Sequence, residues 1–115
     1  MVELKIATHI DPDGIATISL KGMLDAYSYE PFERALNNLL ENQHYKIVVD
    51  LTNLDYISSY GMGLLIGALG TVQQNRGNII LLNPKTPVKD IVELLGMNHL
   101  FPIVKDKESA LKSFN

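Results

Sequence analysis

Alternating apolar and polar residues at the start of the chain predict a β-hairpin. Between Val2 and Ile10 apolar side chains recur at about every second position, the spacing of a strand with one buried face. The segment 11–14 reads Asp-Pro-Asp-Gly, which is typical of tight turns because proline presets its own φ and glycine accepts a positive one. Alternation resumes from Ile15 to Leu20, so we expect two antiparallel strands joined by this turn.

Helical spacing next appears in the segment that follows the hairpin. We expect residues 22–25 to end the hairpin and begin a loop, and a helix to start near Tyr29 with Pro31 in its first turn. Residues 47–49 read Ile-Val-Val, which is typical of a central strand buried on both faces. Residues 50–56 are polar enough that we expect a loop there.

The remaining segments continue the alternation of helices and strands. A second helix is predicted from Ser59 to Gln74, and Gly77 is available for a positive φ where this helix ends. A buried strand over 79–82 and a third helix that Gly96 stops are expected next. A short edge strand over 101–104 and a short helix over 108–114 complete the chain.

This order of elements predicts one α/β domain over residues 1–115. Strands that alternate with helices imply crossover connections and therefore a mostly parallel sheet. We expect a mixed sheet of four to five strands that opens with the hairpin, and about four helices. The composition fits, because 46% hydrophobic residues are enough for a packed core and 20% charged residues are too few for a disordered chain.

Composition also excludes several classes of function. The formal net charge is −3 and no basic stripe is present, so we expect no nucleic-acid partner. The absence of cysteine excludes disulfides, thiolate zinc sites and thiol nucleophiles. The start of the chain shows no signal-peptide pattern, and the most apolar segment, residues 60–69, is shorter than the roughly 20 residues that span a bilayer. We expect a cytoplasmic protein without a membrane partner.

The richest candidate site is Ser58-Ser59-Tyr60-Gly61, at the predicted start of the second helix. One interpretation is structural: a serine here caps the helix by accepting a backbone N–H bond. The other is that a serine accepts a phosphate, which the unpaired N–H groups and the positive end of the helix dipole would tolerate. The two interpretations are compatible.

Three further glycines, Gly63, Gly67 and Gly70, recur at helical intervals along the same helix. We interpret them as positions without side chains that let the helix lie close to the sheet or to a neighbouring helix. The segment is too short for the membrane-dimer interpretation of such a pattern.

Catalytic and metal sites find little support in the sequence. Ser59 lacks the glycine two positions earlier that a nucleophile elbow requires, because Ile57 stands there. Three dispersed histidines show no metal-binding spacing, no Walker-type loop is present, and nothing in the sequence argues that His99 meets Ser59 as a base. We expect no enzyme, no metal and no cofactor.

Taken together, two segments resemble the STAS domains, specifically the stand-alone bacterial anti-sigma factor antagonists. The first runs from Ile47 to Leu65: an apolar strand that ends in Asp-Leu, a short connection, and Ile-Ser-Ser-Tyr-Gly-Met-Gly. The second is Gly22-Met23-Leu24-Asp25, which matches the family's Gly-x-Leu-Asp. The resemblance covers nearly the whole chain and implies the STAS fold.

The resemblance also implies roles for individual residues. Ser59 takes the position of the phosphorylated serine, Ser58 a position often held by aspartate, and Tyr60 a position usually held by a small residue. Gly22 and Asp50 are expected to be structural residues beside the site. The implied partner surface consists of Asp25, Ser58, Ser59, Tyr60, Gly61 and Met62.

Several alternatives stay open around Ser59. Asp25 and Asp50 are expected to approach the helix start from neighbouring strand ends. Asp25 either orients the serine hydroxyl or serves as a turn carboxylate, and Asp50 is expected to bond loop N–H groups. The Tyr60 ring either restricts access of a kinase to Ser59 or contacts a different partner.

By resemblance, the unphosphorylated chain binds an anti-sigma factor that is also a serine kinase, and phosphorylation of Ser59 ends the complex. A PP2C-type phosphatase then resets the switch. The chain itself is expected to be a monomer or weak dimer. The alternative is a STAS interaction or sensor module that binds another protein, a small anion or a nucleotide at the same helix start, without a phosphoswitch.

Overall fold

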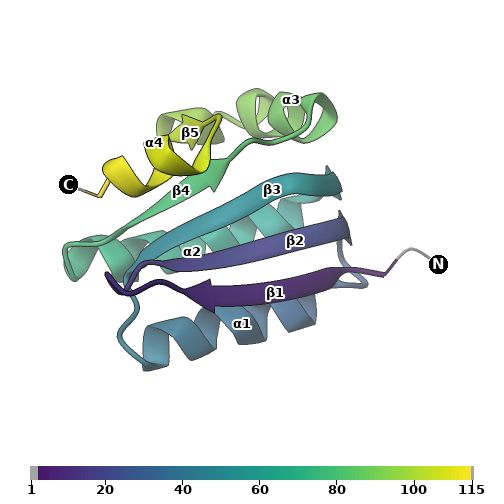
Figure 1. Ribbon diagram of the computed structural model, residues 1–115. Helices are drawn as coiled ribbons and strands as arrows, with labels where there is room; N and C mark the ends of the chain where they lie inside the picture. The colour runs from purple at the N-terminus through teal and green to yellow at the C-terminus, as the bar shows by residue number, and fades with distance from the viewer. Residues whose placement is uncertain (1–2, 115) are drawn as a thin grey trace.

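A single five-stranded sheet organises the chain. The computed structural model describes residues 3–114. The strands lie side by side in the order in which they occur along the chain (Figure 1): β1 (Lys5–Ile10), β2 (Ala16–Leu24), β3 (Lys46–Ile57), β4 (Asn78–Leu82) and β5 (Ile103–Val104). β1 is antiparallel to β2 and every other neighbouring pair is parallel. The predicted α/β domain with an opening hairpin and a mostly parallel sheet is therefore confirmed.

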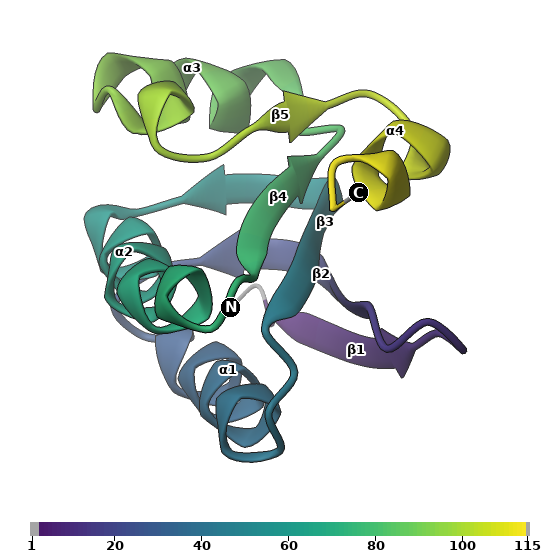
Figure 2. The same cartoon turned by 90° about the vertical axis from the view of Figure 1, so that its left-hand side faces the viewer.

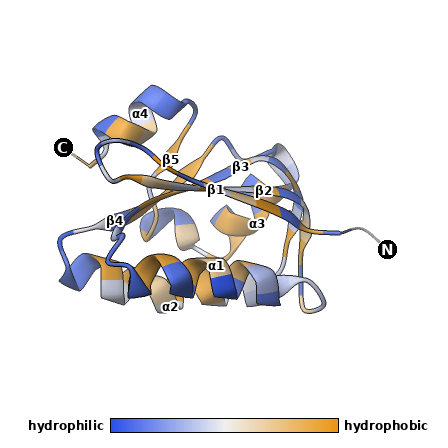
Figure 3. Cartoon of the chain, turned by 60° about the horizontal axis from the view of Figure 1, so that its bottom comes forward, coloured by the Kyte–Doolittle hydropathy of each residue, from blue (hydrophilic) through white to orange (hydrophobic). Residues whose placement is uncertain are grey.

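The helices cover the two faces of this sheet unequally. They are α1 (Tyr29–Glu41), α2 (Ser59–Gln74), α3 (Thr86–Leu94) and α4 (Lys107–Lys112), with a 3₁₀ turn over Met97–His99. Figure 3 shows α1 and α2 beneath the sheet and α4 above it, and Figure 2 shows α1 and α2 next to each other on one side of the strands with α4 on the other. The main core lies between the sheet and α1, α2 and α3, while α4 covers a smaller cluster that includes Val48, Ile80 and Ala110. Within residues 3–114 no helix is both long and apolar enough to cross a membrane.

Local side-chain hydrogen bonds hold two of the predicted boundaries. At the hairpin turn, Asp11 Oδ1 accepts hydrogen bonds from the N–H groups of Asp13 and Ile15, each at 2.9 Å, and Gly14 has a φ of 82°. At the start of α4, Asp106 Oδ1 accepts the N–H of Ser109 at 2.8 Å, and this bond lowers the pKa of the Asp106 carboxyl. Both carboxylates satisfy backbone donors that the strand or helix leaves unpaired.

Two segments predicted as loops, residues 50–56 and 22–25, are strand instead, except that β2 ends at Leu24 and the loop begins at Asp25. β3 continues through residues 50–56 to Ile57, and β2 continues through Gly22 to Leu24. The two strands pair in parallel as far as Leu24 and Ile57, with irregularities between Ser19 and Lys21 and between Gly22 and Met23. These irregularities break the regular two-residue alternation, so the polar residues of β3 looked like a loop although the strand still buries Leu51, Leu54 and Ile57.

The glycines of α2 and of the turn that follows it act differently from the prediction. Arg76, not Gly77, has the positive φ (63°), and Gly77 is required because a Cβ there would overlap the carbonyl oxygen of Tyr45. Gly63, Gly67 and Gly70 are exposed, and a Cβ at any of them would meet no atom within 4 Å. The prediction that these three allow close packing is therefore wrong.

The glycine of α2 that does allow close packing is Gly61. A Cβ on this residue would lie 2.6 Å from Leu24 Cδ2 and 3.0 Å from Ile57 Cγ1. Both neighbours are buried at the ends of the adjacent strands β2 and β3. The first turn of α2 therefore rests directly on the two strand ends, and only glycine fits between them.

This packing predicts opposite effects for two glycine substitutions in one helix. Gly61→Val should lower the free energy of unfolding by about 1–3 kcal/mol, since the added side chain must displace Leu24 or Ile57 in a packed core. Gly63→Ala should raise it by roughly 0.5–1 kcal/mol, because alanine favours helix and the site is open. Urea unfolding followed by circular dichroism measures both. Destabilisation of similar size in both variants would contradict the conclusion that Gly61 is closely packed and Gly63 is open.

Candidate functional site

The candidate site lies where β2 and β3 end and α2 begins. The Ser58 N–H donates a hydrogen bond to the Leu24 carbonyl oxygen at 2.8 Å, which ties the start of α2 to the end of β2. The backbone of Ser58 is extended (φ −98°, ψ 174°), and helical geometry begins with Ser59. The segment 57–61 therefore turns from strand to helix at the carboxyl ends of the parallel strands β2 and β3, where loops and helix N–H groups converge.

The two serines at this junction do different things. The Ser58 side-chain oxygen accepts a hydrogen bond from the Tyr60 N–H at 3.2 Å, so Ser58 is the N-cap of α2. Ser59 is exposed, and its hydroxyl makes no hydrogen bond to another group among residues 3–114. The structural and the functional interpretation of the Ser-Ser pair thus fall on different residues, with the capping role on Ser58 and a free hydroxyl on Ser59.

Tyr60 is turned toward α1. Its ring stacks on Tyr29 with 5.5 Å between ring centroids and 26° between planes, and 55% of the residue stays exposed. A shallow hollow of about 390 Å³ lies beside the stack, lined by Tyr29, Glu33, Ser59, Tyr60, Gly63 and Leu64. The ring leaves Ser59 exposed, and it forms one wall of the surface that a partner would meet there.

Sequence reasoning missed Tyr29 and Glu33 as parts of this site. Both lie on α1, about 30 residues earlier in the chain than Ser59 and Tyr60. Packing of α1 against α2 brings them together, and nothing in the local sequence marks that contact. The sequence does show an aromatic residue, Tyr29, at the start of the first predicted helix, but this residue alone does not reveal which side chain it contacts.

Two residues assigned to the partner surface lie in the core instead. Gly61 is buried against Leu24 and Ile57, and Met62 is only 2% exposed. The rotation of the helix points Met62 toward the sheet, whereas Tyr60 and Gly63 are exposed. Neither Gly61 nor Met62 can present a side chain to a partner, so that part of the prediction is wrong.

Asp25 serves as a turn carboxylate between β2 and α1. Its Oδ1 accepts hydrogen bonds from the N–H groups of Tyr27 (2.9 Å) and Ser28 (3.1 Å) and from the Ser28 hydroxyl (3.1 Å). No hydrogen bond joins it to Ser59 within the described residues. Of the two alternatives for Asp25, the structure therefore favours the turn. This turn leaves Tyr27 96% exposed.

Asp50 lies away from the site, contrary to the prediction. It sits in the middle of β3 opposite Leu82, seven residues before Ile57, which is about 23 Å along an extended strand. Its Oδ1 accepts hydrogen bonds from the Thr52 N–H (3.0 Å) and the Thr52 hydroxyl (2.6 Å). Asp50 was expected at the end of a strand because residues 50–56 are polar and were predicted to form a loop.

Gly22 has a structural role, as expected. Its φ is 108°, and a Cβ there would overlap the carbonyl oxygen of Glu3. The residue therefore lets the chain just before β1 pass close to β2. Any residue with a side chain at position 22 would prevent this close approach of the two backbones, and glycine also adopts the positive φ without strain.

The surroundings of Ser59 suit an acceptor of a charged group. The start of α2 presents the positive end of the helix dipole, which favours an anion on Ser59. Glu33 lines the same hollow and would repel an anion that extends toward α1. His99, at the end of the 3₁₀ turn, makes no hydrogen bond to Ser59 in the part of the chain that the structure describes. The arrangement offers an accessible hydroxyl with no hydrogen-bonded base beside it.

Comparison with known proteins places these features in a family. The family model for the STAS domain matches residues 7–110. A candidate anti-sigma factor antagonist, BtrV of Bordetella bronchiseptica, is 28% identical over 102 residues, which cover 89% of this chain and 88% of BtrV.

Two solved structures share the fold. The anti-sigma factor antagonist SpoIIAA in its unphosphorylated form superimposes with a TM-score of 0.81 at 21% identity, covering 95% of each chain. The Bacillus cell fate determinant SpoIIAA in its phosphorylated form gives a TM-score of 0.74 at 20% identity, covering 96% of this chain and all of that one. With the family model matching nearly the whole chain, the protein belongs to the STAS domain family.

Proposed function

We propose that this STAS domain is an anti-sigma factor antagonist switched by phosphorylation of Ser59. The observation that carries the proposal is the separation of roles at the start of α2, where Ser58 caps the helix and Ser59 presents an exposed hydroxyl that makes no hydrogen bond within residues 3–114. BtrV is described as a candidate anti-sigma factor antagonist and SpoIIAA as an anti-sigma factor antagonist, and SpoIIAA has a phosphorylated and an unphosphorylated form. These relatives support the proposal by likeness.

In this proposal the unphosphorylated chain binds an anti-sigma factor, and the sigma factor is thereby released. The docking surface includes Ser59, the exposed part of Tyr60, and the turn that holds Asp25 and Tyr27. The anti-sigma factor is also the serine kinase, and a PP2C-type phosphatase removes the phosphate. The chain itself performs no chemistry beyond offering the hydroxyl.

Electrostatics explain how one phosphate can end the complex without unfolding the domain. Phosphoserine adds about −1.5 to −2 charges at neutral pH. The N-terminus of α2 tolerates that charge, since its unpaired N–H groups and dipole favour an anion. A partner docked over Ser59 would instead face the new charge beside the carboxylate of Glu33. Phosphorylation therefore acts on the partner surface while the core under α2 stays intact.

The primary test is intact-mass analysis after incubation with ATP and the kinase-like anti-sigma protein from the same organism. The native chain should gain one phosphate, and Ser59→Ala should gain none because the acceptor hydroxyl is gone. Ser58→Ala is the matched control and should still be phosphorylated. A phosphate that persists in Ser59→Ala, or no gain on the native chain, would sink the proposal.

The two serines should also differ in their effect on stability. Ser58→Ala should lower the free energy of unfolding by about 1 kcal/mol, because it removes the cap of α2. Ser59→Ala should change it by less than about 0.5 kcal/mol, since the hydroxyl is exposed and makes no hydrogen bond to any residue that the structure describes. Chemical denaturation of the two variants side by side measures this. Equal losses would mean that both hydroxyls stabilise the helix.

A charge at Ser59 should weaken partner binding while leaving α2 folded. Ser59→Asp should raise the Kd for the anti-sigma factor by about tenfold or more, because like charges placed together at an interface oppose association. Ser59→Asn, similar in size but uncharged, should bind close to the native level. Isothermal titration measures both, with far-ultraviolet circular dichroism to follow α2. Loss of helix in Ser59→Asp would contradict the proposed surface mechanism.

A further inference from the structure

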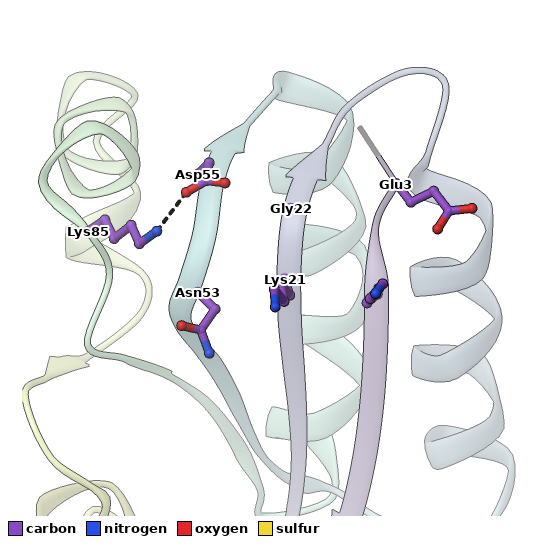
Figure 4. A pocket seen from close by; sticks show the side chains of 7 residues that line it. Glu3, Lys21, Gly22, Asn53, Asp55 and Lys85 are labelled. Atoms are coloured by element: carbon purple, nitrogen blue, oxygen red, sulfur yellow. Dashed lines mark hydrogen bonds and ion pairs between the residues drawn. The ribbon is translucent and has the colours of Figure 1, made fainter. Parts of the chain in front are cut away.

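The sheet face opposite α1 and α2 is only partly covered. α4 packs over its β4 side, and Lys107 Nζ reaches Thr17 Oγ1 on β2 at 2.6 Å. Figure 1 looks onto this face and shows no helix in front of β1, β2 and β3 within the described residues. A hollow of about 560 Å³ lies there, lined by Glu3, Lys5, Lys21, Gly22, Asn53, Asp55 and Lys85 (Figure 4).

Two lysines stand side by side in the floor of this hollow. Lys5 on β1 is directly opposite Lys21 on β2, so their side chains project from the same face of the sheet. Both are exposed, and neither forms an ion pair within residues 3–114. Like charges directly opposite each other destabilise a sheet, so this pair is unfavourable unless something negative lies over it.

A third donor continues the row across the sheet. Lys21 is opposite Asn53 on β3, whose side-chain amide is exposed in the same hollow. Figure 4 shows Lys21 and Asn53 on adjacent strands at the same height. Two ammonium groups and an amide thus lie in a row across three neighbouring strands.

The carboxylates near this row compensate its charge only in part. Asp55 pairs with Lys85 at 2.6 Å, and Asp50 accepts hydrogen bonds from Thr52. Glu3 lies at the rim, and its carboxylate points away from Lys21 in Figure 4. Three lysines (Lys5, Lys21 and Lys85) and two carboxylates (Glu3 and Asp55) line the hollow, so its net charge is +1 in a chain whose formal net charge is −3.

We infer that this hollow binds a small anion with two linked phosphate groups, held by Lys5 and Lys21 with Asn53 as an additional donor. Adjacent phosphates supply charge for both ammonium groups at once, and each contact is a charge-assisted hydrogen bond. The site is separate from Ser59, because it lies on the opposite face of the sheet from α2. It does not depend on the proposed phosphoswitch.

The test is titration of the native chain at low ionic strength with inorganic pyrophosphate and, in a second arm, with ADP. We expect saturable binding in the calorimetric titration. In ¹H–¹⁵N NMR spectra the largest amide shifts should be those of Lys5, Lys21 and Asn53. Tighter binding of ADP would identify a nucleotide as the source of the diphosphate, and equal binding would identify the diphosphate alone. Shifts centred on Ser59 and Tyr60, or no saturation at millimolar concentration, would overturn the site.

Variants matched in net charge distinguish binding at this site from non-specific attraction of the anion to exposed lysines. The double variant Lys5→Gln/Lys21→Gln should weaken pyrophosphate binding at least about tenfold. The control Lys46→Gln/Lys105→Gln removes two exposed lysines elsewhere and should bind within about twofold of the native chain. Equal weakening in the two double variants would overturn the inference.

Two further variants protect the test against a folding defect. Lys5→Arg/Lys21→Arg keeps both charges and should retain binding, so its failure while folded would count against the site. Glu3→Gln removes the rim carboxylate and should tighten binding by roughly twofold to fivefold. A thermal melt should show Lys5→Gln/Lys21→Gln at least as stable as the native chain, because it relieves the like-charge pair. If that variant does not fold, the two single lysine-to-glutamine variants replace it, and each should weaken binding.

Discussion

The contact of Gly61 with Leu24 and Ile57 is the constraint on which the rest of the site depends. It lets the first turn of α2 rest on the ends of β2 and β3, and the bond from the Ser58 N–H to the Leu24 carbonyl holds that turn in place. With the helix start held there, Ser58 becomes the cap and Ser59 becomes the first exposed position. A residue with a side chain at position 61 would push the helix away from the strands.

Rigidity beneath the site matters for the proposed switch. The residues under the start of α2 are buried at the strand ends, while Ser59, Tyr60 and Tyr27 lie at the surface above them. A charge added at Ser59 therefore changes the electrostatics of a surface that lies over buried, closely packed residues. Such a switch needs no second conformation of the domain, because the change in binding comes from repulsion at the partner surface.

Unequal coverage of the sheet gives the domain two distinct surfaces. Three helices bury one face, and the junction of that layer with the strand ends forms the Ser59 surface. The short α4 covers only part of the other face and leaves the Lys5–Lys21 row exposed. Because the sheet separates the two surfaces, a ligand in the lysine hollow and a partner at Ser59 do not compete for the same residues.

The sequence by itself determined the hairpin, the order of strands and helices, the bounds of α2 and the position of Ser59 at its start, because these follow from short-range periodicity and turn chemistry. Only the tertiary structure decided that residues 50–56 are strand, that Met62 is buried, that Asp50 lies far from Ser59 and that Tyr60 stacks on Tyr29. Those features depend on pairing and packing between segments distant in the chain, where bulges hide the strand period and helix rotation sets which side chains face out. The local sequence around a residue does not indicate which distant residue it will contact.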